Sequence, residues 1–177
     1  MAQPFQMPIK RSPRKDPQQH RVYRMENSAI GARNYRTLKR ADILALVRSV
    51  CRNYRVKAPL VRFRRVGKWA AEWSDIAGGL ITLNPHKGTG QDLLTVTHEL
   101  AHHVHHKLSK GRDEQHEAHG AEFMAVHMSI LDTTRVIPIE GMRVIAKRWR
   151  VRYRDPGPNN NLIRLRRICR TKKNAPK

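Results

Sequence analysis

The sequence His98-Glu99-Leu100-Ala101-His102 constrains the fold of this chain more than any other segment. It lies within residues 93–106, which contain no proline and have Glu99 as their one formally charged residue. Apolar residues recur through this segment at helical spacing, which is typical of a buried helix. We therefore predict a helix over residues 90–108, with both histidines and Glu99 on it.

The spacing of the two histidines indicates a metal site. On a helix, positions i and i+4 share one face, so His98 and His102 can place two imidazole nitrogens on one ion. Glu99 then lies beside the ion, where its carboxylate can accept a proton from a zinc-bound water. The pattern predicts a zinc hydrolase in which His98 and His102 bind the metal and Glu99 is the catalytic base.

A catalytic zinc site usually has three protein ligands and an open position for water, so a third ligand is expected elsewhere. The best source is the segment 116–123, at the start of a second predicted helix. His119 is the favoured ligand because the adjacent Gly120 leaves its backbone uncrowded. His116, one turn earlier, and Glu122 are the alternatives.

Three further histidines follow the first motif. His105 lies seven residues after His98, so it also lies on the metal-facing side and could orient a ligand, although a packed histidine is the commoner case. We expect His103 and His106 to face away from the metal and to make surface or partner contacts.

Periodicity upstream of the motif indicates a mixed scaffold. Apolar residues at helical spacing predict a helix over residues 41–54, and three short apolar runs predict strands over 60–66, 68–74 and 78–83. The predicted fold class is α+β: an N-terminal helix, a short antiparallel three-stranded sheet and two metal-bearing helices.

The paired motifs resemble a known family. The sequence from His98 to His102, a polar loop, and then His119-Gly-Ala-Glu-Phe123 resemble the SprT-like zinc metallopeptidases, the Spartan type, whose pattern is HExxH followed by HGxxF or HGxxW. The segment 79–85 is similar to the strand that precedes their catalytic helix. The resemblance covers about residues 40–132.

This resemblance implies a small zincin-like domain that binds one Zn²⁺ per chain. It implies that His98, His102 and His119 are the zinc ligands and that Glu99 is the catalytic base. It also implies that the substrates are proteins associated with DNA. Many family members carry a four-cysteine zinc ribbon after the catalytic part, and this sequence has only two cysteines, so a ribbon of that kind is excluded.

Charge is distributed unevenly along the sequence. The net charge of +22 comprises +8 over residues 1–40, +6 over 41–90, −4 over 91–140 and +12 over 141–177. A charge this large favours a polyanionic partner, and nucleic acid is the natural candidate. We therefore predict a basic, disordered N-terminal extension over 1–38, the peptidase domain over 39–140, and a nucleic-acid-binding extension over 141–177.

The C-terminal arginines are the predicted nucleic-acid contacts. Between residues 148 and 154 arginine alternates with apolar or aromatic residues, so an extended strand would carry its guanidinium groups on one face. The basic residues then continue toward the C-terminus as a tail. The predicted contacts, largely independent of sequence, are Arg148, Arg150, Arg152, Arg154, Arg164, Arg166, Arg167 and Arg170.

Two functions compete at this point. The first is a zinc endopeptidase that acts on proteins associated with nucleic acid, DNA in particular. The second is a non-catalytic nucleic-acid-binding or assembly protein, such as a phage structural protein, that retains the fold and the zinc. Two cysteines without metal or redox spacing and no long apolar run indicate a cytoplasmic or nucleoid-associated protein without a membrane span.

Overall fold

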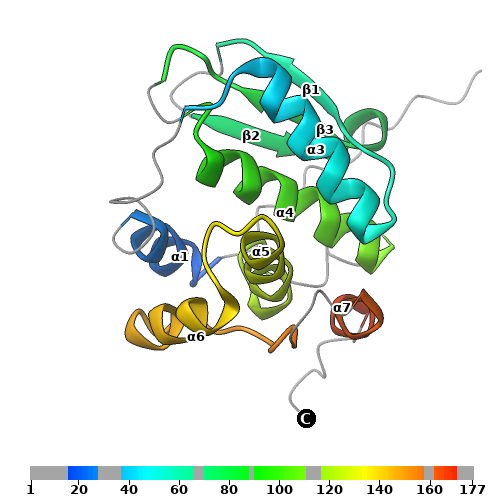
Figure 1. The fold of residues 1–177 in the computed structure, drawn as a ribbon. Helices are drawn as coiled ribbons and strands as arrows, with labels where there is room; N and C mark the ends of the chain where they lie inside the picture. Colours follow the sequence, from blue (N-terminus) through cyan, green and yellow to red (C-terminus); the bar gives the residue numbers. More distant parts are fainter. Residues whose placement is uncertain are drawn as a thin grey trace, which may run out of the picture.

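The computed structural model describes residues 16–27, 37–65, 70–87, 90–110, 117–157 and 162–170. A small sheet lies at one end of the molecule and the helices pack to one side of it, which confirms the α+β fold class (Figure 1). The elements are α1 (Gln19–Met25), α3 (Arg40–Tyr54), β1 (Leu60–Phe63), β2 (Ala71–Ser74), the 3-10 turn η2 (Ile76–Gly78), β3 (Leu80–Leu83), α4 (Leu93–Ser109), α5 (Ala121–Thr133), α6 (Ile139–Arg148) and α7 (Leu162–Arg170).

The sheet is mixed, which corrects the prediction of antiparallel pairing throughout. Its strand order is β1-β3-β2, with β3 parallel to β1 and antiparallel to β2. The short turn η2 joins β2 to β3, which suits their antiparallel pairing, and β1 pairs with the other edge of β3 in the parallel direction. All four residues of the central strand are buried, so its apolar run packs on both faces. Each strand is shorter than predicted, and residues 66–69 lie outside the described residues.

Helix α4 crosses the centre of the molecule between the sheet and α5 (Figure 1). Its start is fixed by Asp92, whose carboxylate accepts a hydrogen bond from the backbone N–H of Thr95 at 2.6 Å. Leu100, Ala101 and Val104 are fully buried along its inner face. The predicted helix is therefore confirmed, and it packs against the sheet on one side and against α5 on the other.

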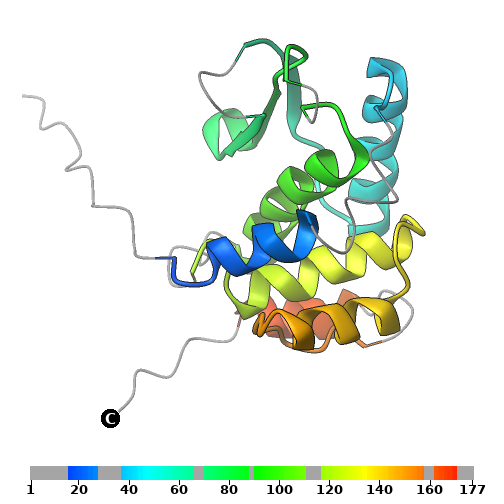
Figure 2. The same cartoon turned by 90° about the vertical axis from the view of Figure 1, so that its left-hand side faces the viewer.

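The N-terminal segment from residue 16 to residue 27 is folded, which corrects the prediction of disorder for this part of 1–38. Helix α1 buries Val22 and Met25 completely in the common core. It lies next to α6 in both views (Figures 1 and 2). Residues 1–15 and 28–36 lie outside the described residues, so the prediction is not tested there.

The C-terminal region also belongs to the core. Helices α6 and α7 pack on α5, and α7 also packs on α4. The inner faces of both helices are buried, with Met142, Ala146, Leu165 and Cys169 at 0% exposure. Apart from the residues that the structure leaves undescribed, the region from 141 onward is thus not a solvated extension. None of the described helices is long and apolar enough to cross a membrane.

The arginines from residue 148 to residue 154 do not lie on one extended strand, so the condition for a shared guanidinium face is not met. Arg148 ends α6, and Arg150 has a left-handed backbone with φ of 54°. Val151 begins a segment without regular structure. The physical reason is that Ile139, Met142 and Ala146 recur at helical spacing, so helix packing decides the conformation up to residue 148.

Candidate metal centre

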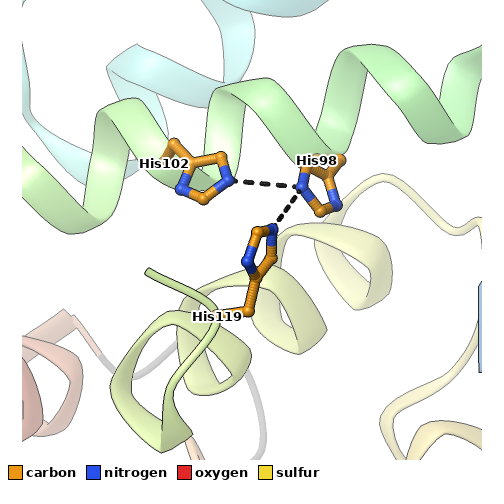
Figure 3. Close-up of side chains that lie close together, drawn as sticks. All are labelled: His98, His102 and His119. Carbon is orange, nitrogen blue, oxygen red and sulfur yellow. Dashed lines mark hydrogen bonds between the residues drawn. The ribbon is translucent and has the colours of Figure 1, made fainter. Parts of the chain in front are cut away.

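Three imidazoles converge between α4 and the start of α5. The Nε2 atom of His98 lies 3.1 Å from Nε2 of His119 and 3.2 Å from Nε2 of His102 (Figure 3). Helix α4 supplies His98 and His102 one turn apart, and His119 lies two residues before α5 begins. The structure thus brings together the three residues that the sequence predicts as metal ligands.

The two alternative ligands differ in their placement. His116 lies outside the described residues, so its position is not tested. Glu122 lies on α5 and forms an ion pair with Arg154, with 3.0 Å between the carboxylate oxygen and the guanidinium nitrogen. Glu122 therefore has a cationic partner of its own, and it is not part of either group of clustered ligand atoms found among the described residues.

Helix α1 and the residues before it bring two carboxylates to the outer nitrogens of the ligands. Asp16 accepts hydrogen bonds from Nδ1 of His119 at 2.5 Å and from the backbone N–H of the same residue at 3.1 Å. Glu26 lies 2.7 Å from Nδ1 of His98. Gln18 adds a hydrogen bond from its side-chain amide to the backbone oxygen of His119 at 2.7 Å. Carboxylates in this position fix the orientation and tautomer of metal-binding imidazoles.

Sequence reasoning missed both carboxylates. The available signal was that Asp16 and Glu26 are the only acidic residues among the first 40, in a segment that carries ten lysines and arginines. In so basic a segment, the expected partners of an acidic residue are the nearby lysines and arginines. A contact with a histidine far along the chain leaves no local pattern in the sequence.

The tautomers imposed by these carboxylates suit a metal ion. Burial raises the pKa of Asp16. Its hydrogen bonds and its charge interaction with His119 together outweigh this effect, so the pKa of Asp16 lies below its usual value and the carboxyl is ionised. Nδ1 of His119 must then carry the hydrogen, which leaves a lone pair on Nε2. Burial raises the pKa of Glu26 to about 7, while the charges of His127 and His119 oppose the rise, so it is the ionised form of Glu26, present above that pH, that imposes the same tautomer on His98. The two Nε2 lone pairs then face each other at 3.1 Å, an arrangement that a cation between them stabilises.

Burial also keeps the ligands neutral. Burial lowers the pKa of His98 and of His102 well below its usual value, and the neighbouring histidines lower it further. Neutral imidazole is the form that binds a metal. In tetrahedral zinc sites two imidazole nitrogens lie about 3.3 Å apart, so the spacing of these nitrogens and the chemistry of the donor set both fit zinc.

Glu99 faces a cleft beside the three histidines. The cleft has a volume of about 410 Å³, and Tyr23, Trp73 and His102 also line it. Burial raises the pKa of Glu99 to about 8, with the charges of Glu26 and Glu72 adding to the shift, while a hydrogen bond from the backbone N–H of Trp73 opposes it. Strand β2 therefore positions the carboxylate, which can take up a proton at the mouth of the metal centre.

His103 corrects one prediction and His127 adds a residue that the sequence did not suggest. His103 is fully buried and its Nε2 lies 2.8 Å from the backbone oxygen of Lys57, so it is not a surface contact. A Cβ atom at Gly79 would lie 2.4 Å from its ring. His127 is also fully buried, with Nδ1 3.4 Å from the Glu26 carboxylate. Its spacing of eight residues from His119 was the one available signal.

The other two histidines that directly follow the motif differ from each other. His105 is buried on α4, as expected for a packed histidine, and it is not part of the metal-ligand groups among the described residues. His106 is partly exposed, and its ring lies 5.3 Å from that of Trp73. Neither contributes a ligand to the three-histidine cluster.

Several of the predicted nucleic-acid contacts have partners within the protein. Arg152 forms an ion pair with Glu117 at 2.6 Å, and Arg154 pairs with Glu122. Such pairs lie close to the metal centre and hold the segment after α6 against the start of α5. The charges of these two arginines are therefore partly neutralised by carboxylates of the protein itself.

The other predicted arginines fall into two groups. Arg164 donates to the backbone oxygen of Asp155 at 2.8 Å, and Arg170 donates to the backbone oxygen of Leu108 at 3.3 Å. Arg148, Arg150 and Arg167 are exposed, as are Arg164 and Arg170, while Arg166 is half-buried. Within the described part of the chain, Arg148 and Arg150 form no ion pair, so they are the best placed for an external anion.

Comparison of the chain with family models, with curated proteins and with solved structures found no match. Any proposal about function therefore rests on the geometry and chemistry of the candidate metal centre.

Proposed function

We propose that this protein is a zinc-dependent metallopeptidase of the SprT-like type that cleaves proteins associated with nucleic acid. The observation that carries the proposal is the convergence of three imidazole Nε2 atoms within 4.8 Å of one another, beside a carboxylate that opens onto a cleft. Three histidines with an open fourth position are typical of catalytic rather than structural zinc sites.

The roles of the side chains follow from their positions. His98, His102 and His119 would hold the zinc, with Glu26 and Asp16 orienting two of them. When bound, zinc would supply a Lewis acid that lowers the pKa of a water molecule in the open position. Glu99 accepts the proton of the attacking water and then donates it to the nitrogen of the leaving amine.

Charge supports an association with nucleic acid. The net charge of +22 would be costly in self-repulsion unless an anion neutralised part of it. The segment 91–140, which contains the ligands and Glu99, carries −4, while the flanking parts are strongly basic. We therefore assign polyanion binding to the basic flanks and cleavage to the cleft, with exposed Arg148 and Arg150 among the contacts.

The test compares the wild type with Glu99→Gln, each loaded with zinc, on a histone mixture in the presence of double-stranded DNA. Gln keeps the shape of the side chain but cannot accept a proton. We expect both proteins to retain one zinc, and the variant to cleave at least about 10²-fold more slowly, the usual contribution of a general base.

The same experiment addresses the competing function. The large basic surplus outside the metal centre favours a non-catalytic nucleic-acid-binding or assembly protein as the second candidate. Zinc-loaded wild type that binds DNA but cleaves no protein would establish that candidate and refute the peptidase. Equal cleavage by both forms would remove Glu99 from the mechanism.

A further inference from the structure

Tyr23 lies at the mouth of the metal centre, where helix α1 places it. Its ring centroid is 5.5 Å from that of His98 and 5.2 Å from that of His119. Its side chain lines the same cleft as Glu99, and 37% of the residue remains exposed. Tyr23 is thus the phenol that a substrate in this cleft would meet.

The hydrogen bonding of Tyr23 leaves its hydroxyl hydrogen free. The side-chain amide of Gln19, one turn earlier on α1, donates to the Tyr23 oxygen at 3.3 Å. The phenol therefore acts as an acceptor in this contact, and the part of the chain that the structure describes provides no acceptor for its own hydrogen. Accepting one hydrogen bond polarises a hydroxyl and strengthens it as a donor.

Peptide hydrolysis in this cleft would need such a donor. Attack of water on a carbonyl carbon moves negative charge onto the carbonyl oxygen, and a fixed donor at that position stabilises the transition state. Trp73 carries one rival donor, but its Nε1 atom is buried and has no partner among the described residues, so it does not open onto the cleft. The Gln19 amide also lines the cleft, and it donates to the Tyr23 oxygen. Glu72 and Glu99, which also line the cleft, would repel an oxyanion.

We propose that Tyr23 is a catalytic residue whose hydroxyl donates a hydrogen bond to the oxyanion that forms on the scissile carbonyl. This inference rests on the proposed function. The proton stays on the phenol throughout, and no bond to Tyr23 forms or breaks. Gln19 is a positioning residue that holds the hydroxyl in the cleft.

The test is Tyr23→Phe, which removes the hydroxyl and keeps the ring against His98 and His119. Its matched control is Tyr54→Phe, which removes a buried hydroxyl bonded to Ser129 at 2.8 Å on α5, remote from the cleft. Both variants are measured for zinc content, for kcat and KM on labelled casein, and for the dissociation constant of a phosphinic tetra-alanine peptide. The phosphinic group imitates the tetrahedral oxyanion.

We expect Tyr23→Phe to bind one zinc, to keep KM within about two-fold, and to lose about 10²–10³-fold in kcat, the usual effect of one missing oxyanion donor. Its affinity for the phosphinic peptide should fall at least about ten-fold, because the lost contact belongs to the transition state. Tyr54→Phe should match the wild type in kcat and in phosphinic affinity. Loss of zinc in Tyr23→Phe, or unchanged kcat and affinity, would overturn the inference.

The two measurements separate this inference from the proposed function. If Tyr23→Phe cleaves as fast as the wild type, the peptidase proposal is supported and Tyr23 is not the oxyanion donor. If the wild type cleaves nothing but binds the phosphinic peptide more tightly than Tyr23→Phe does, the peptidase proposal is refuted and the hydrogen bond from Tyr23 is supported. A zinc-loaded wild type that cleaves neither casein nor the histone mixture with DNA, and does not bind the phosphinic peptide, would overturn both.

Discussion

Asp16 should determine how tightly the centre binds zinc, although it makes no contact with the metal position itself. Its carboxylate holds Nδ1 of His119 at 2.5 Å and the backbone N–H of His119 at 3.1 Å, with only 11% of its side chain exposed. Asp16→Ala removes both contacts. Loss of such an outer carboxylate typically weakens metal binding about 10–100-fold, which corresponds to about 1.4–2.7 kcal/mol.

A graded pair of variants separates charge from geometry. Asp16→Asn keeps an oxygen that can accept the Nδ1 hydrogen but lacks the negative charge, so its zinc affinity should lie between those of the wild type and Asp16→Ala. Asp42→Ala is the matched control, because it removes an exposed carboxylate from the first turn of α3. Its zinc affinity should equal that of the wild type.

Zinc affinity is measured by competition with a chromophoric chelator at neutral pH, and the melting temperature of each metal-free variant shows whether it is folded. Asp16→Ala with a wild-type dissociation constant would refute the argument that α1 supports the metal centre. An equal loss in Asp42→Ala would mean that overall charge, rather than the His119 contact, controls affinity.

Two further predictions concern the C-terminal region. Leu165→Ala should lower the free energy of unfolding, measured in urea, by about 2–5 kcal/mol because Leu165 is fully buried. Ile163→Ala is the control, and because Ile163 is 83% exposed it should change this free energy by at most about 0.5 kcal/mol. Equally small effects of both substitutions would mean that α7 does not pack on the core. Replacing both Arg148 and Arg150 by Ser should reduce the slope of log K against log salt for duplex DNA by about two, and an unchanged slope would place the phosphate contacts elsewhere.

Local patterns predicted the inner part of the centre. His98 and His102 are four residues apart on one uninterrupted helix, so their convergence follows from helix geometry alone. His119 could be chosen because a short loop and a second helix bring the following segment back to the first. These relations involve neighbours in sequence, which is why they could be read without a structure.

The supporting shell could not be read in the same way. Asp16 and His119 are 103 positions apart, and Glu26 and His98 are 72 apart. Their contacts depend on how α1 packs on the core, and a basic, proline-rich segment gives no periodic signal for that packing. The arginine alternation after residue 148 misled for a related reason, because it spans a helix end and an irregular segment rather than one strand.

The metal content of the purified protein tests the central claim most directly. Elemental analysis and zinc X-ray absorption should give one zinc per chain, bound by three imidazole nitrogens and one oxygen ligand, and His119→Ala should lose most of that zinc. Wild-type protein that binds no zinc after loading, or His119→Ala that retains it fully, would contradict the three-histidine centre.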